Sequence, residues 1–250
     1  MLPILQVGPL AIQFPGLILL AGVWLGLLLA EAHAARRGVA PNHLYNLVFI
    51  LLIAGLIGAR LVYALRYPQI FAASPLSLLS LNPGLLDTWG GLATGALAAA
   101  VYGQRKGLAL WPTLDALTPF LAVIAVAVAL SHLAAGTAFG APTNLPWGIE
   151  LWGTRRHPSQ VYEALAAGLI LVVLWPGRKS FDTWPGGAYF LAFVAASSLS
   201  RLLLESLRGD SLLLPGGLRT AQAAAWVILI ASLWGLRQRM AEEGTLRKTE

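Results

Sequence analysis

Seven long stretches of mainly apolar residues divide this chain, and they limit its fold more than any other feature. They lie at 12–30, 44–65, 85–102, 114–135, 161–175, 187–204 and 220–236. A helix needs roughly 20 apolar residues to cross a bilayer, and charged residues make up only 11% of the 250 positions. We therefore expect an all-α, polytopic integral membrane protein with about seven transmembrane helices. A single domain would cover residues 1–240, followed by a polar cytoplasmic tail at 241–250.

Glycines mark the third stretch as a helix that packs closely against another. Gly91 and Gly95 are four residues apart, which is the small-xxx-small spacing of tightly packed membrane helices. The fifth stretch is the shortest of the seven. These two stretches are predicted as helices with less regular ends than the others.

The positions of the basic residues predict how the chain crosses the membrane. Ten of the 17 Lys and Arg residues lie in every second loop or near the C-terminus: Arg36, Arg37, Arg105, Lys106, Arg178, Lys179, Arg237, Arg239, Arg247 and Lys248. Cytoplasmic loops carry an excess of basic residues, so we expect the N-terminus outside and the C-terminus in the cytoplasm. Residues 1–10 contain no Lys or Arg. The first stretch is therefore predicted to stay as a helix and not to be a cleaved signal peptide.

The seven remaining basic residues are all arginines, and this orientation puts them outside or within the membrane. They are Arg60, Arg66, Arg155, Arg156, Arg201, Arg208 and Arg219. Asp87, Glu150, Glu163, Glu205 and Asp210 share that side. Arginine offers a rigid fork of donors that suits phosphate or carboxylate. Each arginine alone could equally anchor a helix end at lipid headgroups.

The absence of certain residues excludes several kinds of chemistry. The chain has no cysteine, which excludes disulfides, thiolate nucleophiles and cysteine-bound metals, so a reacting thiol would belong to a substrate. No spacing of His and carboxylates is typical of a metal site, and we expect no metal and no cofactor. The net charge of +6 fits cytoplasmic loops facing anionic lipids, and we expect no nucleic-acid partner.

The densest polar cluster is residues 155–163, with the sequence RRHPSQVYE, directly before an apolar stretch. Charged groups beside a membrane segment are costly to keep, which indicates a substrate or ion site. Ser159 is predicted to cap the helix that follows, with Glu163 complementing the helix dipole. The start of this helix, with Arg156 and His157 before it, would also bind an anion.

A second polar stripe follows the sixth stretch. Arg201 and Glu205 are four residues apart and Arg208 is three further on, so they share one helix face and can pair. They either neutralise one another, or Glu205 orients one arginine while another contacts an anionic headgroup. Arg60 and Tyr63 form a shorter polar stripe near the outer end of the second stretch, with the same two interpretations.

Several segments match the motifs of one known family. Residues 156–164 read RHPSQVYEA, which resembles the RHPSQ-x-YEA segment of the prolipoprotein diacylglyceryl transferase family of bacterial inner-membrane enzymes. Further similar segments are GARLVY at 58–63, GGL at 90–92, PTNLPWG at 142–148 and RLLLESLRGD at 201–210. They occur in the family's order over nearly the whole chain. The resemblance implies seven spans with an outside N-terminus in the bacterial cytoplasmic membrane.

The resemblance also implies a reaction. The family transfers diacylglyceryl from phosphatidylglycerol to the lipobox cysteine in the signal peptide of a prolipoprotein, and glycerol phosphate leaves. This chain departs from the family at Trp89, where the family has a catalytic histidine. At 129–137 it reads ALSHLAAGT in place of Arg-x-Gly-Asn-Phe-x-Asn-Gly-Glu, with Ala129 and Thr137 replacing the arginine and the acid. The alternatives are a transferase with another acceptor, or a non-catalytic relative that binds phospholipid or lipoprotein.

The candidate site combines the resemblance with the outer polar residues. His157, within the family motif, and His132, in the fourth stretch, are the candidate catalytic bases; a lone histidine such as His132 could instead be a hydrogen-bonded interior residue. The candidate substrate-binding residues are Arg60, Tyr63, Gly140, Arg156, Ser159, Gln160, Tyr162, Glu163, Arg201, Glu205 and Arg208. The four arginines of this set would bind phosphate, and its two glutamates would orient them.

Overall fold

The structure is a computed structural model that describes residues 4–7, 10–79 and 82–249. The chain divides into two compact units. The large unit comprises Met1–Gly38 and Leu114–Glu250, and the small unit comprises Val39–Thr113. Both are mostly helical, and each of the seven predicted stretches coincides with a helix among the described residues.

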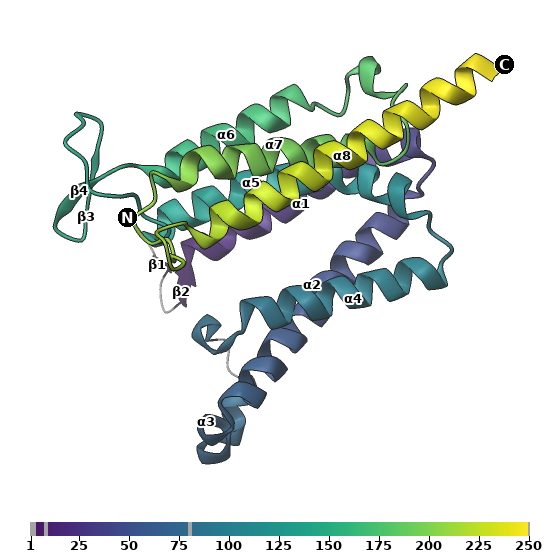
Figure 1. The fold of residues 1–250 in the computed structure, drawn as a ribbon. Helices are drawn as coiled ribbons and strands as arrows, with labels where there is room; N and C mark the ends of the chain where they lie inside the picture. The colour runs from purple at the N-terminus through teal and green to yellow at the C-terminus, as the bar shows by residue number, and fades with distance from the viewer. Residues whose placement is uncertain (1–3, 8–9, 80–81, 250) are drawn as a thin grey trace. The chain divides into compact units, whose positions relative to one another are not determined.

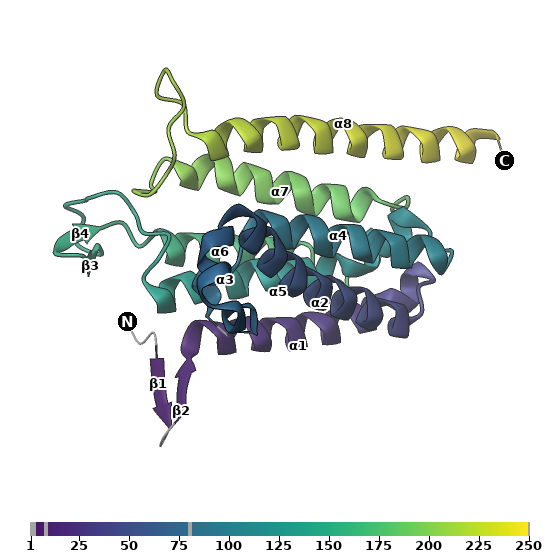
Figure 2. The same cartoon turned by 90° about the horizontal axis from the view of Figure 1, so that it is seen from below.

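Five helices make up most of the described part of the large unit (Figure 1). They are α1 (Phe14–Ala34), α5 (Leu110–Ala135), α6 (Ser159–Val173), α7 (Ala188–Glu205) and α8 (Thr220–Thr249). α1 packs closely on α5, because a side chain at Gly22 would overlap Ala127 and one at Gly26 would meet Phe120. α7 and α8 lie side by side, and Figure 2 shows α8, α7, α5 and α1 in succession.

The small unit is built on a close pair of helices, α2 (Pro41–Arg66) and α4 (Thr88–Arg105), with the short α3 (Pro68–Ala73) between them in the chain. A Cβ atom at Gly95 would lie 2.6 Å from the carbonyl oxygen of Leu51 on α2, and one at Gly91 would lie 3.0 Å from that of Gly55. The predicted close packing at Gly91 and Gly95 is therefore confirmed. The third stretch becomes helical only at residue 88, because the Asp87 side chain accepts a hydrogen bond from Gly90 N (2.7 Å) and caps the helix.

Two short hairpins add to the predicted helical fold. β1 (Ile4–Val7) pairs antiparallel with β2 (Leu10–Gln13), and β3 (Ile149–Leu151) pairs antiparallel with β4 (Thr154–Arg156). The β3–β4 hairpin projects beyond the ends of α5 and α6 (Figure 1). Trp152 and Gly153 form its turn, both at positive φ (55° and 70°). The sequence did not predict these strands, since three or four residues are too few to establish an alternating pattern.

Backbone hydrogen bonds join the α5–α6 connection to the α7–α8 connection. Segment 139–143 lies between segments 155–157 and 207–209, and we call these three segments the end layer. Ala141 N donates to Leu207 O (2.8 Å), His157 N donates to Ala141 O (3.0 Å), and Gly209 N donates to the carbonyl of residue 139 (2.9 Å). The end layer therefore fixes the residues that precede α6 relative to those that follow α7.

Among the described helices, five are long and apolar enough to cross a membrane. These spans are Phe14–Arg37, Pro41–Arg66, Leu110–Ala135, Ala188–Glu205 and Thr220–Glu242. α6 is also apolar but has only 15 residues, as the short fifth stretch predicted. The prediction of a mostly helical, multi-pass membrane protein is confirmed.

At the end of the large unit opposite the end layer, a buried carboxylate joins three helices. Asp115 of α5 is fully buried, and it accepts hydrogen bonds from the backbone N–H groups of Gly187 (2.8 Å) and Phe190 (2.9 Å) at the start of α7. Arg37, just after α1, lies 3.5 Å from the same carboxylate and donates to Phe181 O (2.9 Å). Asp115 of α5 thus caps the N-terminus of α7.

Candidate functional site

Charged side chains from α6, α7 and the segment after α7 meet beside the end layer. We call Glu163, Arg201, Glu205, Arg208 and Asp210 the carboxylate–arginine cluster. Glu163 Oε1 lies 2.8 Å from Arg208 Nη1 and 3.2 Å from Arg201 Nη1, so one carboxylate joins both arginines. Arg201 Nη2 lies 2.9 Å from Glu205 Oε2, which confirms the predicted pairing along α7. Arg208 also binds Asp210 with two hydrogen bonds of 3.0 and 2.8 Å.

Arg219, just before α8, stabilises this cluster through hydrogen bonds. Its Nη1 atom donates to the carbonyl oxygens of Glu205 (2.5 Å) and Arg208 (2.7 Å) and to Ser211 Oγ (2.9 Å). Ser211 in turn donates to Glu205 Oε1 (2.7 Å). The end of α7 is thereby held in place by a guanidinium that binds mainly backbone.

The two arginines of the cluster differ in how accessible they are. The side chain of Arg208 is 11% exposed and that of Arg201 is 39% exposed. Burial alone would lower the pKa of Arg208, but hydrogen bonds to Asp210 and Glu163 raise it above its ordinary value. Arg208 is thus a fixed cation, and Arg201 is the arginine that an incoming anion can reach.

His132 lies in the last turn of α5, near the carboxylate–arginine cluster. Its ring interacts electrostatically with Glu163 and with Arg208. Its Nδ1 atom is buried and makes no hydrogen bond within the described residues. An imidazole with an uncommitted ring nitrogen can accept or donate a proton.

His157 lies in the end layer. Its ring faces Tyr162 at 6.3 Å between centroids, and its Nδ1 atom is buried without a hydrogen bond in the described part of the chain. The hydroxyl of Tyr162 accepts a hydrogen bond from Trp147 Nε1 (2.8 Å). The structure places these two predicted site residues together, next to an exposed aromatic side chain.

Arg156 and Gly140 help to build the end layer. The Arg156 guanidinium lies over the ring of Phe139 (4.8 Å) and donates to the carbonyls of Gly140 and Leu151, both at 3.3 Å. At Gly140 a side chain would overlap the backbone of His157. Arg156 was predicted to bind phosphate, and in this structure its donors are directed at protein carbonyls.

The RHPSQ segment turns its serine and glutamine inward. The prediction that Ser159 caps α6 is wrong: the cap position is Pro158, which makes no side-chain capping bond. Ser159 Oγ instead donates to Ala138 O (2.8 Å), and Gln160 Nε2 donates to Thr137 O (2.7 Å). Both side chains are buried, so they tie α6 to the residues that follow α5.

Arg60 and Tyr63 belong to the small unit. Arg60 Nη2 donates to Asn82 O (3.4 Å). Tyr63 packs against the rings of Tyr67 (4.8 Å between centroids) and Phe71 (6.2 Å). Both lie in the last two turns of α2, where the sequence predicted them.

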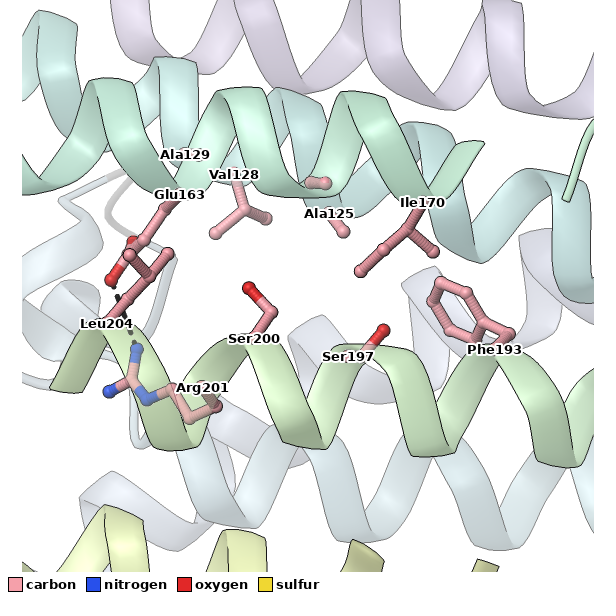
Figure 3. Close-up of a pocket in the computed structure, with 11 residues that line it drawn as sticks. Ala125, Val128, Ala129, Glu163, Ile170, Phe193, Ser197, Ser200, Arg201 and Leu204 are labelled. Carbon is pink, nitrogen blue, oxygen red and sulfur yellow. Dashed lines mark hydrogen bonds and ion pairs between the residues drawn. The ribbon is translucent and has the colours of Figure 1, made fainter. Parts of the chain in front are cut away.

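A cavity of about 180 Å³ opens beside the carboxylate–arginine cluster, between α5, α6 and α7. Figure 3 shows Glu163 and Arg201 at one end of it and Phe193 at the other. Ala129 lines this cavity with only a methyl group. A charged end and a mostly apolar interior suit an amphiphilic molecule.

Sequence reasoning missed some polar residues of this region. Ser197 and Ser200 line the cavity, and they share one face of α7 with Arg201 at helical spacing. That spacing is visible in the sequence, but serines in an apolar stretch carry little signal by themselves. Ser211 and Arg219 act through contacts made in the folded chain, and no spacing predicts these contacts.

Comparison with known proteins gives a consistent result. The sequence profile of the prolipoprotein diacylglyceryl transferase family matches residues 3–237. The chain is 32% identical to the phosphatidylglycerol–prolipoprotein diacylglyceryl transferase of Gloeobacter violaceus, over 96% of this chain and 94% of that protein. It is 31% identical to the enzyme of the same name from Synechococcus sp. (strain CC9902), over 92% of this chain and 90% of that protein.

Proposed function

The chain belongs to the prolipoprotein diacylglyceryl transferase family and is a membrane transferase, and from this premise we propose its reaction. It transfers diacylglyceryl from phosphatidylglycerol to the lipobox cysteine of a prolipoprotein signal peptide. The relatives named above carry this activity in their names. The observation that carries the proposal is the carboxylate–arginine cluster at the mouth of a cavity between membrane helices.

In the proposed step, the client's cysteine sulfur attacks the glyceryl carbon that bears the phosphate. A C–S bond forms, the C–O bond to phosphate breaks, and glycerol phosphate leaves with the electron pair. The thiol proton passes to a base. The site must therefore supply a cation for the leaving phosphate and an acceptor for the proton.

Arg201 and Arg208 are the proposed phosphate ligands. Arg201 is the more exposed of the two and lines the cavity. Glu163 and Glu205 are positioning residues, because each holds a guanidinium by an ion pair of 3.2 Å or less. An arriving phosphate would compete with Glu163 for Arg201.

His132 is the better supported of the two candidate bases. It interacts electrostatically with Glu163, whereas His157 contacts Tyr162. Tyr162, Ser159, Gln160, Gly140 and Arg156 support the site through the end layer and its junction with α6. Arg60 and Tyr63 remain proposed headgroup ligands from the small unit, on the basis of the family resemblance.

The proposed setting is the bacterial cytoplasmic membrane, with seven spans, an outside N-terminus and a cytoplasmic tail at 241–250. The five long apolar helices support this, as do α4 and α6, which coincide with the other two apolar stretches. The alternation of basic residues between loops supports the orientation. Residues 1–240 would then act as one domain.

The test is release of glycerol phosphate from phosphatidylglycerol vesicles that contain the full chain, with a lipobox peptide as acceptor. Arg201→Ala should reduce the rate on the order of 100-fold, and Arg201→Lys should restore it only in part, because lysine lacks the guanidinium fork. Arg239→Ala is the matched control, since Arg239 pairs with Glu242 on α8, outside the site. Wild-type rates from Arg201→Ala would refute the assignment.

A second candidate function rests on Ala129. Where the family's signature has an arginine, this cavity holds a methyl group, which favours a relative that binds phospholipid but has altered catalysis or another acceptor. This alternative predicts that phosphatidylglycerol binds while the lipobox peptide releases no glycerol phosphate. Binding and release measured on the same preparation distinguish the two functions.

A further inference from the structure

The cavity between α5, α6 and α7 contains two hydroxyl groups that the transfer step does not use. Ser197 and Ser200 project from α7 toward α5 and α6, next to Arg201 (Figure 3). Neither hydroxyl makes a hydrogen bond within the described part of the chain, although serine hydroxyls elsewhere in it bind backbone carbonyls, as Ser206 and Ser232 do. A hydroxyl that faces an apolar space without an acceptor is unfavourable. Both serines are therefore suited to donate to a bound molecule.

The cavity adjoins a larger apolar groove. This groove has a volume of about 350 Å³ and runs between α6 and α7, lined by residues such as Leu169, Val173 and Leu199. Ile170, Ser200 and Leu204 line both spaces. Because Leu169, Val173 and Leu199 are also among the exposed apolar residues, the groove is open to the surroundings of α6 and α7.

The cavity and the adjoining groove together offer the three kinds of contact that a glycerophospholipid needs. The charged end of the cavity has Arg201 and Glu163, the two hydroxyls come next along α7, and the groove is apolar throughout its lining apart from Ser200. Ser197 and Ser200 are about 4.5 Å apart along the helix axis at 1.5 Å per residue. A diacyl phospholipid presents a phosphate, then two ester carbonyls that only accept hydrogen bonds, then acyl chains.

We propose that Ser197 and Ser200 determine lipid specificity by donating hydrogen bonds to the ester carbonyls of the phospholipid, with an acyl chain in the α6–α7 groove. This proposal rests on the proposed function for the identity of the lipid. The two serines select ester-linked over ether-linked lipids, because an ether has no carbonyl to accept their hydrogen bonds. They do not take part in the bond-breaking step.

The experiment compares binding of diester and diether phosphatidylglycerol to the purified full chain in competition with a fluorescent phospholipid. The wild type should prefer the diester about tenfold, which is typical of losing one or two hydrogen bonds. Ser197→Ala/Ser200→Ala should bind both lipids within about twofold of each other, because alanine donates to neither. Alanine is the best helix former, so the double variant is expected to fold.

Ser198→Ala is the matched control, since Ser198 is buried on the same helix and lines neither space. It should retain the wild-type preference. Equal binding of the two lipids by the wild type, or an unchanged preference in the double variant, would overturn the proposal. The readout is binding, so a chain that shows this preference but releases no glycerol phosphate contradicts only the proposed transfer reaction.

A bulky residue tests the groove separately. Ala196→Phe would fill it, whereas Leu165→Phe places the same ring at an exposed position of α6 that lines neither space. Ala196→Phe should weaken binding of long-chain phosphatidylglycerol at least fivefold and that of a short-chain analogue far less. Equal effects on both chain lengths would contradict the placement of the acyl chain.

Discussion

Asp115 holds the start of α7 from a position 72 residues earlier in the chain. The cap residue of α7, Gly187, offers no side chain, so both oxygens of this buried carboxylate replace a local cap. Arg37 depends on the same carboxylate for its ion pair of 3.5 Å, and its side chain is only 9% exposed. Asp115→Ala would leave two backbone N–H groups without their hydrogen-bond acceptor and the buried Arg37 guanidinium without its carboxylate partner.

The magnitude follows from these contacts. Removing one partner of a buried ion pair costs about 3–5 kcal/mol, and each orphaned N–H group costs about 1–3 kcal/mol. These costs overlap, and Arg37 keeps its hydrogen bonds to the carbonyls of Phe181 and Trp184. We therefore expect Asp115→Ala to lower the free energy of unfolding by about 4 kcal/mol. Asp115→Asn keeps one acceptor oxygen and should cost about half as much.

Thermal unfolding in detergent, followed by circular dichroism, measures this effect. For a chain of this size about 4 kcal/mol corresponds to a decrease in Tm of roughly 8–16 °C. Asp182→Ala is the control, because Asp182 also pairs with an arginine, Arg36, but at 3.8 Å with both side chains 43% exposed. Such a pair contributes about 0–1 kcal/mol. If the two alanine variants melted within 2 °C of each other, the capping role of Asp115 would be refuted.

Two further predictions concern backbone geometry. Gly95→Ala should destabilise the α2–α4 pair by about 2 kcal/mol, because the new methyl group would meet Leu51 O at 2.6 Å. Gly103→Ala on the same helix has open space around it and should be neutral or stabilising. The melting temperatures of the two variants give the comparison. Trp152→Asn should raise stability by about 1 kcal/mol, because Asn-Gly suits a turn with positive φ at both positions, and a lower Tm for this variant would contradict that reasoning.

Helix positions and local pairs could be predicted from the sequence. The apolar stretches located the long helices, and the spacing of Arg201 and Glu205 predicted an ion pair that the fold contains. Both depend on neighbours within one helix. The i, i+3 spacing also placed Arg208 beside the same glutamate, at 3.9 Å, although α7 ends at Glu205 and Arg208 lies in the turn that follows.

Contacts between distant segments could not be predicted in the same way. Ser159 has the residue type and position of a cap, yet the carbonyl of Ala138 accepts its hydrogen bond. Asp115 has no polar neighbour in sequence that indicates its role, because the backbone N–H groups that donate to it belong to Gly187 and Phe190, at the start of α7. The groove between α6 and α7 depends on how these two helices pack, and the periodicity of apolar residues in the sequence does not predict that packing.

The end layer has an evolutionary consequence. Its three segments are joined by backbone N–H and C=O groups, which most residues supply, apart from the close approaches at Gly140 and Gly209, where a side chain would overlap neighbouring backbone. Side chains that line the neighbouring cavity, such as Ala129, can therefore be exchanged without dismantling the scaffold that aligns α6 with α7. Successive substitutions in the cavity can thus change which molecule it binds, while the backbone hydrogen bonds of the end layer stay the same.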